Sequence, residues 1–227
     1  MMMRLGLGNA AGLRILCLGA HCDDIEIGCG GTILTLTNAS TDIAVHWVVF
    51  SANEEREHEA RRCASMFLAE ARESTIVVKR FRDGYFPYDG AAIKDSFEEL
   101  KEQISPDIIF THHGRDGHQD HRLISELTWN TFRGHLILEY EIPKYDGDLG
   151  APSVFAPLAP EIAEEKLRYL LECYKSQSSR HWFSRDVFMG IMRLRGMEAN
   201  AGVDHAEAFY GRKLVLAVTG DREACLT

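Results

Sequence analysis

Long hydrophobic runs, clustered basic residues and closely paired cysteines are all missing from this 227-residue sequence. No apolar run approaches the roughly 20 residues of a membrane-spanning helix, so we expect no permanent membrane insertion. Lysine and arginine are scattered and the formal net charge is -9, which leaves no cationic surface for a phosphate backbone. We therefore expect no nucleic-acid partner.

The six cysteines form no CxxC pair, and several of them lie in or beside apolar runs. This usage favours reduced, buried thiols over a disulfide framework. Arg4 alone precedes a glycine-rich stretch, and the first apolar run leads into a charged cluster instead of a small-residue cleavage site. These features predict a cytoplasmic protein.

The glycines of residues 28–31 lack the GxGxxG spacing of a dinucleotide-binding loop. The turn before them carries histidine and aspartate in place of the glycines that let a pyrophosphate approach. We interpret residues 28–31 as a glycine-rich turn that opens a helix and allows close packing. A nicotinamide enzyme is not expected.

The sequence does contain apolar runs that alternate with helical patterns. The expected strands cover residues 13–20, 42–50, 74–79 and 107–113. The expected helices follow the glycines and cover residues 54–72 and 92–104. Nearly all-apolar strands between helices predict an α/β fold of three layers, with a mainly parallel sheet and helices on both faces. The chain length fits one domain over residues 1–227.

The pattern is less regular after Gly134. We expect strands at 135–141 and 211–218, with helices at 161–173 and 185–200 between them. The stretch 142–160 is rich in proline, glycine and aspartate, which predicts a long loop that caps a site.

Two clusters of histidines and carboxylates follow the first and fourth apolar runs, AHCDDIE at 20–26 and DGHQDH at 116–121. Ligands of parallel α/β folds bind beyond the carboxyl ends of the strands, where both clusters would lie. Two imidazoles and one carboxylate can hold zinc or iron with a position open for water, and the other groups can supply a base and an oxyanion donor. Solvated surface loops are the alternative for either cluster alone.

The segment AHCDDIEIGCGGT and the later HQDH resemble the PIG-L or LmbE-like de-N-acetylases. That family has the pattern A-H-P-D-D before a glycine-rich helix start, followed later by H-x-D-H. The resemblance extends over most of the chain and implies a Rossmann-like fold with a mononuclear, usually zinc, centre. By this resemblance His21, Asp24 and His121 hold the metal, while Asp23 acts as general base on the attacking water.

The resemblance also implies roles for the other residues of the second motif. His118 would stabilise the tetrahedral oxyanion or protonate the leaving amine, and Asp120 would orient a histidine ring. Cys22 stands where the family has proline, and we interpret it as a packed thiol. We interpret His112 and His113 as structural histidines, since the second motif already contains two.

Two further residues are candidates for substrate binding. Arg56 and Glu59 match an R-x-x-E pattern of the family, and Arg56 would reach a substrate hydroxyl or phosphate. An exposed surface pair is the alternative. Asp83 lies in the irregular stretch 80–91, where the family places a substrate-contacting loop, with an ordinary turn as the alternative.

The activity implied by the resemblance is hydrolysis of an N-acetyl group on an amino sugar or amino-sugar conjugate, giving free amine and acetate. Zinc is the expected metal, and the same ligand types also accept iron(II) or another divalent ion. An amidase of a sugar-thiol conjugate and a non-enzymatic sugar or nucleotide-sugar binding module are the alternatives. Apolar residues in the 142–160 stretch and the C-terminal helices also allow a homo-oligomer.

Overall fold

The computed structural model describes residues 12–215. Seven strands in that range form a sheet with the order β3-β2-β1-β4-β5-β7-β6. β1 to β5 pair in parallel, whereas β7 pairs antiparallel with both β5 and β6. The strands are β1 Arg14–Gly19, β2 Ala44–Val49, β3 Glu73–Val78, β4 Ile108–His112, β5 Leu136–Tyr140, β6 Val154–Leu158 and β7 His205–Gly211.

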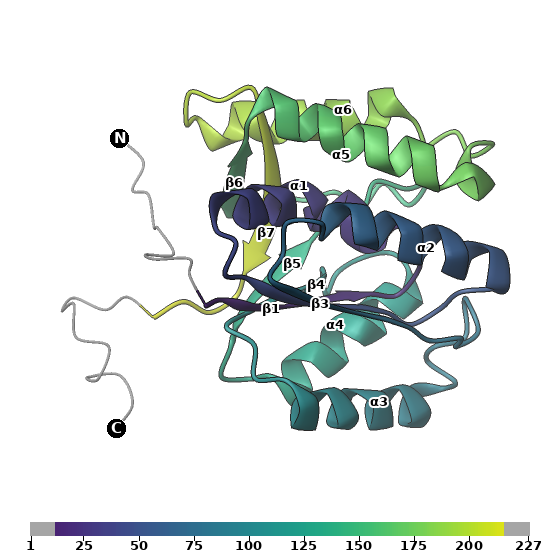
Figure 1. Ribbon diagram of the computed structural model, residues 1–227. Coiled ribbons are helices and arrows are strands. Elements are labelled where there is room, and N and C mark those ends of the chain that lie inside the picture. The colour runs from purple at the N-terminus through teal and green to yellow at the C-terminus, as the bar shows by residue number, and fades with distance from the viewer. Residues whose placement is uncertain (1–11, 216–227) are drawn as a thin grey trace.

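Helices cover both faces of this sheet (Figure 1). α3 and α4 lie on one face, and α1 and α2 lie on the other. α5 packs on α1 and α2, and α6 packs on α5, β6 and β7. The predicted Rossmann-like, three-layer α/β fold is therefore confirmed. No helix of residues 12–215 is long and apolar enough to cross a membrane. The helices are α1 Asp24–Ala39, α2 Glu54–Phe67, α3 Gly90–Gln103, α4 Gln119–Thr131, α5 Pro160–Cys173, the 3-10 helix η1 Lys175–Gln177 and α6 Arg185–Ala199.

β1 is buried on both of its faces, which explains its nearly unbroken apolar sequence. Ile15 and Cys17 pack into the core under α1, while Leu16 and Leu18 pack into the core on the side of α3 and α4. Successive side chains of a strand point to opposite faces, so only a central strand between two helical layers needs every residue to be apolar.

The glycines after β1 lie inside α1, so the expected glycine-rich turn is wrong at this point, but close packing is confirmed. A Cβ atom on Gly30 would lie 2.6 Å from Cε1 of Phe67 in α2. A Cβ on Gly31 would lie 2.7 Å from Cδ1 of Leu158 in β6. The glycines therefore let α1 approach its neighbours more closely than any other residue would.

Three elements differ from the sequence predictions. α4 was not expected, and β6 lies within the stretch predicted to be a loop. β6 is an edge strand, where Pro157 costs no internal hydrogen bond, so its proline does not end the strand. β7 ends at Gly211, the residue at which the last strand was predicted to begin, and residues 212–215 are irregular. The remainder of the predicted 211–218 strand lies outside the described residues, as does Cys225.

Candidate active site

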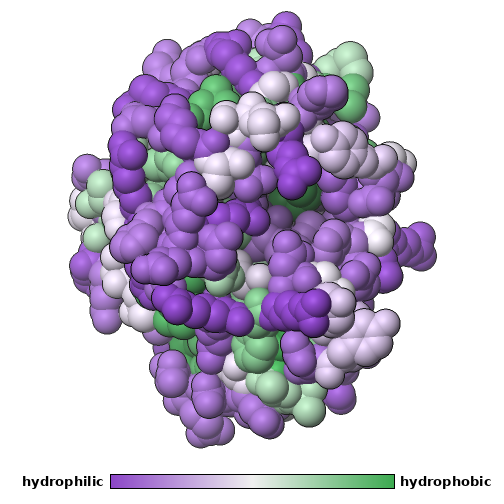
Figure 2. All heavy atoms as spheres, turned by 90° about the vertical axis from the view of Figure 1, so that its right-hand side faces the viewer, coloured by the Kyte–Doolittle hydropathy of each residue, from purple (hydrophilic) through white to green (hydrophobic). Residues whose placement is uncertain are grey.

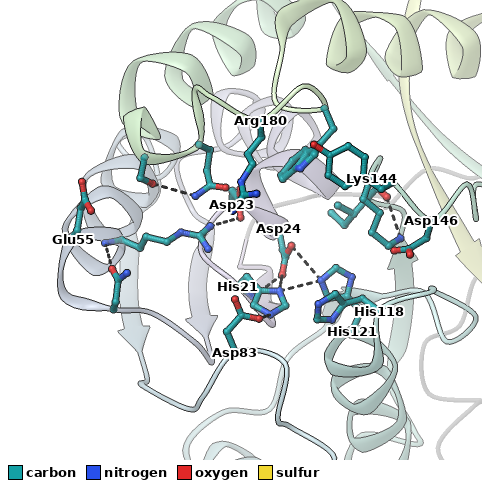
Figure 3. A pocket seen from close by; sticks show the side chains of 17 residues that line it. His21, Asp23, Asp24, Glu55, Asp83, His118, His121, Lys144, Asp146 and Arg180 are labelled. Carbon is teal, nitrogen blue, oxygen red and sulfur yellow. Dashed lines mark hydrogen bonds and ion pairs between the residues drawn. The ribbon is translucent and has the colours of Figure 1, made fainter.

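A cavity of about 580 Å³ opens where the parallel strands end. Figure 2 views the molecule from this side and shows a hollow surrounded largely by hydrophilic residues. The walls come from the loop after β1, the start of α2, the 81–89 loop and the start of α4. Two segments from the C-terminal half, 142–146 and 176–182, complete them (Figure 3). Both predicted clusters therefore meet in one pocket.

The three predicted metal ligands converge on one point of this pocket. Nδ1 of His21 lies 3.1 Å from Nε2 of His121 and 3.5 Å from Oδ2 of Asp24. Nε2 of His121 lies 3.6 Å from Oδ1 of Asp24. Ligand atoms on a tetrahedral zinc with bonds of about 2.0–2.1 Å are roughly 3.3 Å apart, so these separations suit such an ion. All three residues are buried.

In both His21 and His121, one ring nitrogen points into the three-ligand cluster and the other points out of it. The outer nitrogen of each of these rings faces a carboxylate. Nε2 of His21 lies 3.3 Å from Oδ2 of Asp120 and 3.1 Å from Oδ1 of Asp83. Nδ1 of His121 lies 3.1 Å from Oδ2 of Asp116, a close approach too bent for a hydrogen bond. A carboxylate favours the proton on the nitrogen that faces it, which leaves a lone pair on the inner nitrogen. The inner nitrogens and Asp24 then form a cluster of acceptors, and a divalent cation fits there.

Asp23 caps the start of α1 and points away from Asp24 (Figure 3). Its Oδ1 accepts a hydrogen bond from Nη2 of Arg56 at 2.8 Å, while its Oδ2 is buried without a hydrogen-bond partner among the described residues. Burial raises the pKa of Asp23 to about 7, although the charge of Arg56 opposes this rise. A carboxylate that titrates near neutral pH is suited to exchange a proton with a water molecule.

His118 is the N-cap residue of α4, and its Nδ1 accepts a hydrogen bond from the backbone N–H of Asp120 at 3.2 Å. Since a backbone N–H can only donate, a neutral His118 ring carries its proton on Nε2. Burial and the neighbouring His21 lower the pKa of His118, which favours the neutral ring. His118 lines the cavity and can therefore present an N–H donor to a bound molecule.

The two candidate substrate residues lie at different depths of the cavity. Arg56 is mostly buried and paired with Asp23, so it is not the exposed surface pair considered as the alternative. Glu59 accepts hydrogen bonds from the backbone N–H and hydroxyl of Ser176, at 2.9 and 2.5 Å, and thereby holds η1 in place. Asp83 is 65% exposed and lines the cavity beside His21, so it can contact both the ring and a ligand.

His112 takes a larger part in the site than its interpretation as a structural histidine implied. Its ring stacks on His121 with centroids 3.9 Å apart, and its Nε2 lies 3.2 Å from Oδ2 of Asp24. Among the described residues, His112, Asp24 and His121 form one of three groups of side chains that could hold a metal ion. The other two are His21, His118 and His121, and His21, Asp83, His118 and Asp120. His113 instead pairs with Glu139 at 2.8 Å, away from the cluster.

Cys22 is fully buried, and its thiol donates to the backbone carbonyl of Ser51 at 3.2 Å. Burial raises the pKa of the Cys22 thiol, which keeps the sulfur protonated. The geometry therefore agrees with a packed thiol in the position where the family has proline.

Several cavity residues had no sequence signal. Lys144, Tyr145 and Asp146 come from the segment after β5, and Arg180 and Trp182 come from the segment between η1 and α6. Neither segment has a periodic pattern or a motif, so only the folded chain brings them to the site. Ser176 and Gln177, in η1, also line the cavity.

The fold is the three-layer α/β fold expected of the de-N-acetylase family, and the two motifs that resemble that family meet in one pocket. The PIG-L family model, described as GlcNAc-PI de-N-acetylase, matches residues 16–132. This chain belongs to the PIG-L family of deacetylases. The uncharacterized deacetylase YaiS of Escherichia coli (strain K12) is 31% identical over 167 residues, which are 69% of this chain and 88% of that protein.

Solved structures share the fold at lower identity. The N,N'-diacetylchitobiose deacetylase of Pyrococcus horikoshii aligns with a TM-score of 0.66 and 22% identity, covering 87% of this chain and 83% of that one. GalB, the 4-carboxy-2-hydroxymuconate hydratase of Pseudomonas putida KT2440, aligns with a TM-score of 0.72 and 15% identity, covering 91% and 99%. A deacetylase and a hydratase thus share this fold, so the reaction has to be argued from the site.

Proposed function

We propose that the protein is a metal-dependent N-deacetylase that converts an N-acetylated amino sugar, or a conjugate of one, into acetate and the free amine. The observation that carries this proposal is the convergence of His21, Asp24 and His121 at separations that suit zinc. Asp23 and His118 flank this cluster. Oδ2 of Asp23 is available to accept a proton, and Nε2–H of His118 is available to donate a hydrogen bond.

The reaction needs a base for water, a stabilised oxyanion and a proton for the leaving amine. When bound, the metal supplies Lewis acidity that polarises the acetyl carbonyl and lowers the pKa of the attacking water. Oδ2 of Asp23 takes the proton from that water as its oxygen attacks the carbonyl carbon. Nε2–H of the neutral His118 ring donates a hydrogen bond to the oxyanion, and the proton taken up by Asp23 passes to the amine nitrogen as the C–N bond breaks.

Arg56 and Asp120 act on this machinery through other residues. The ion pair with Arg56 fixes Asp23, so that Oδ1 is occupied and Oδ2 is the free oxygen. Asp120 accepts hydrogen bonds from the backbone N–H groups of Gly84 and Phe86, at 2.6 and 3.2 Å. These bonds hold the Asp120 carboxylate against the outer nitrogen of His21.

A sugar substrate is supported by the composition of the cavity. Tyr145 and Trp182 offer rings against which a sugar can pack, and Asp83, Asp146 and Arg180 offer charged groups for its hydroxyls. The volume of about 580 Å³ lies within the range of small-molecule sites. The structural likeness to a diacetylchitobiose deacetylase also favours an acetylated sugar. Zinc is the proposed metal, and the two nitrogen ligands and one oxygen ligand also suit iron(II).

The test combines elemental analysis with acetate and amine release from N-acetylglucosamine and N,N'-diacetylchitobiose. We expect about one metal ion per chain and turnover in the wild type. Asp23→Asn should keep the metal and lose about 10²–10⁴-fold in kcat, whereas His121→Ala should lose the metal. His58→Ala, a change of an exposed α2 histidine outside the cavity, is the matched control and should keep both.

The outcomes separate the alternatives. A wild type that binds no metal under any loading condition would overturn the proposal and favour a non-enzymatic sugar-binding module. Metal binding with turnover of a sugar-thiol amide, but of no acetylated sugar, would favour the amidase.

A further inference from the structure

Lys144 lies in the segment between β5 and β6 and lines the cavity, yet its side chain is only 11% exposed. Its Nζ lies 3.0 Å from Oδ2 of Asp116 and 2.5 Å from Oδ2 of Asp148. It also donates to the backbone carbonyl of Ile142 at 3.4 Å. The ammonium group donates hydrogen bonds to Asp148 and to the carbonyl of Ile142, and it forms an ion pair with Asp116. Lys144 is therefore fixed inside the protein and not free to follow a ligand.

Asp116, the partner of Lys144, contacts both histidines of the HQDH motif. Its Oδ2 lies 3.1 Å from Nδ1 of His121, and its Oδ1 accepts a hydrogen bond from the backbone N–H of His118 at 2.8 Å. The Asp116 side chain is only 3% exposed. This one carboxylate thus contacts the ring of His121 and the backbone of His118.

A buried carboxylate needs a positive partner to remain charged and in place. Among the lysines and arginines of the described residues, Lys144 is the one that forms an ion pair with the Asp116 carboxylate. If the ammonium were removed, the Asp116 carboxylate would turn toward water, and Nδ1 of His121 would lose a fixed negative partner. The proton position on His121 depends on that partner.

The segment that carries Lys144 is itself held in place. Glu141 accepts two hydrogen bonds of 2.7 Å from the guanidinium of Arg195 in α6. The backbone N–H of Gly117 donates to Asp148 at 2.5 Å, and a Cβ on Gly117 would lie 2.8 Å from Cβ of Asp146. The segment therefore packs directly on the loop that leads into α4.

We propose that Lys144 is a positioning residue for the candidate metal ligand His121, through Asp116. Lys144 holds the Asp116 carboxylate beside Nδ1 of His121, so that the proton stays on Nδ1 and the lone pair of Nε2 faces the metal. Tyr145 and Asp146 follow Lys144 and line the same cavity, so the contact also connects the wall that meets the substrate with the metal ligand. This inference rests on the proposed metal-dependent function.

The test compares Lys144→Met with Asp148→Asn, which alters the other carboxylate on the same ammonium group. For Lys144→Met we expect zinc affinity, measured by competition with a chelator, to fall about tenfold. The visible absorption spectrum of the cobalt(II)-loaded protein should change, and kcat should fall more than KM rises. Asp148→Asn should keep the wild-type zinc affinity and cobalt spectrum. Lys144→Arg keeps the positive charge and should therefore retain most of the zinc affinity and of the cobalt spectrum.

A double-mutant cycle tests the route through Asp116. In the Asp116→Asn background, Lys144→Met should weaken zinc binding much less than it does in the wild type. Circular dichroism and thermal unfolding establish that each variant is folded before its affinity is compared.

Three results would overturn the inference. A folded Lys144→Met protein with wild-type zinc affinity and cobalt spectrum would contradict it directly. Equal effects of Asp148→Asn and Lys144→Met would show that the lysine only anchors its segment. A wild type that binds no metal would remove the proposed function together with this inference, whereas the first two results leave that function intact.

Discussion

At the scale of single residues, the two histidines of the HQDH motif differ in which ring nitrogen is free. Nδ1 of His118 is engaged by the backbone of α4, and Nδ1 of His121 faces Asp116. Both rings therefore present Nε2 to the site, but His118 presents a proton and His121 presents a lone pair. Neighbouring groups thus assign a donor and a metal ligand within one short motif.

His118 has two roles, as the N-cap of α4 and as a hydrogen-bond donor to the oxyanion, and substitution can separate them. His118→Asn keeps a side-chain acceptor for the N-cap, so we expect a nearly unchanged free energy of unfolding and an unchanged metal content. It removes the Nε2–H donor, so kcat should fall about 10²–10³-fold. Urea unfolding, elemental analysis and steady-state kinetics measure the three quantities.

His118→Ala is the comparison variant because it removes both the cap and the donor. It should lose about 1 kcal/mol of stability in addition to the activity. A His118→Asn protein with wild-type kcat would contradict the assignment of His118 as the hydrogen-bond donor to the oxyanion.

At the scale of elements, α1 is positioned by what its glycines allow. The helix passes so close to β5 that a Cβ on Gly28 would overlap the ring of Tyr140. The hydroxyl of Tyr140 in turn donates to the backbone carbonyl of Leu18 at 2.6 Å. The start of α1, which carries Asp24, is therefore set against the ends of β1 and β5.

The expected effect of adding one methyl group to a helix depends on this packing. Gly28→Ala should destabilise the protein by about 1–3 kcal/mol, because overpacking of the core outweighs the better helix propensity of alanine. Gly190→Ala in α6 is the matched control, since a Cβ there meets nothing within 4 Å. That variant should gain about 0.5–1 kcal/mol.

Urea unfolding at one temperature measures both alanine variants. A stabilising effect of Gly28→Ala would mean that α1 does not approach Tyr140 as closely as the structure indicates.

The strands with unbroken apolar sequence were predictable because burial on two faces leaves a local signature, as in Ile15 to Leu18. β6 was not predictable in this way, since its residues Val154–Leu158 are partly exposed at the sheet edge and include Pro157. The proposed metal ligands His21, Asp24 and His121 could be predicted from the sequence because they lie in two motifs that resemble those of a known family. Lys144, in contrast, lies in a segment without any motif, and only the packing of the 142–146 segment on the loop before α4 brings it to Asp116.

At the scale of the whole molecule, the fold does not decide the reaction, since a deacetylase and a hydratase share it. Here the site joins the two halves of the chain. The proposed metal ligands and base come from residues before position 122, within the range matched by the family model, while Lys144, Arg180 and Trp182 come from beyond it. The proposed catalytic groups thus come from the first part of the sequence, whereas the cavity residues offered for substrate contact come from both parts, since Asp83 is one of them.

A bound ion should therefore stabilise the whole molecule, because its ligands come from β1–α1 and α4, which are distant in the sequence. A ligand that binds only the folded state at 100 times its Kd adds about 2.7 kcal/mol of stability. For a protein of this size that corresponds to an increase in Tm of roughly 5–10 °C. Treatment with a chelator should lower Tm by this amount, and added zinc should restore it.

The increase in Tm caused by zinc should be absent in His121→Ala and present in His58→Ala. Differential scanning fluorimetry with zinc and with chelator measures this difference in Tm for each variant. The comparison within each variant removes the direct effect of the substitution on folding, because only the difference between zinc and chelator is used. An equal zinc-dependent increase in Tm in His121→Ala would place the stabilising ion elsewhere on the chain. It would then contradict the ligand set of His21, Asp24 and His121 even if the protein proved to be a deacetylase.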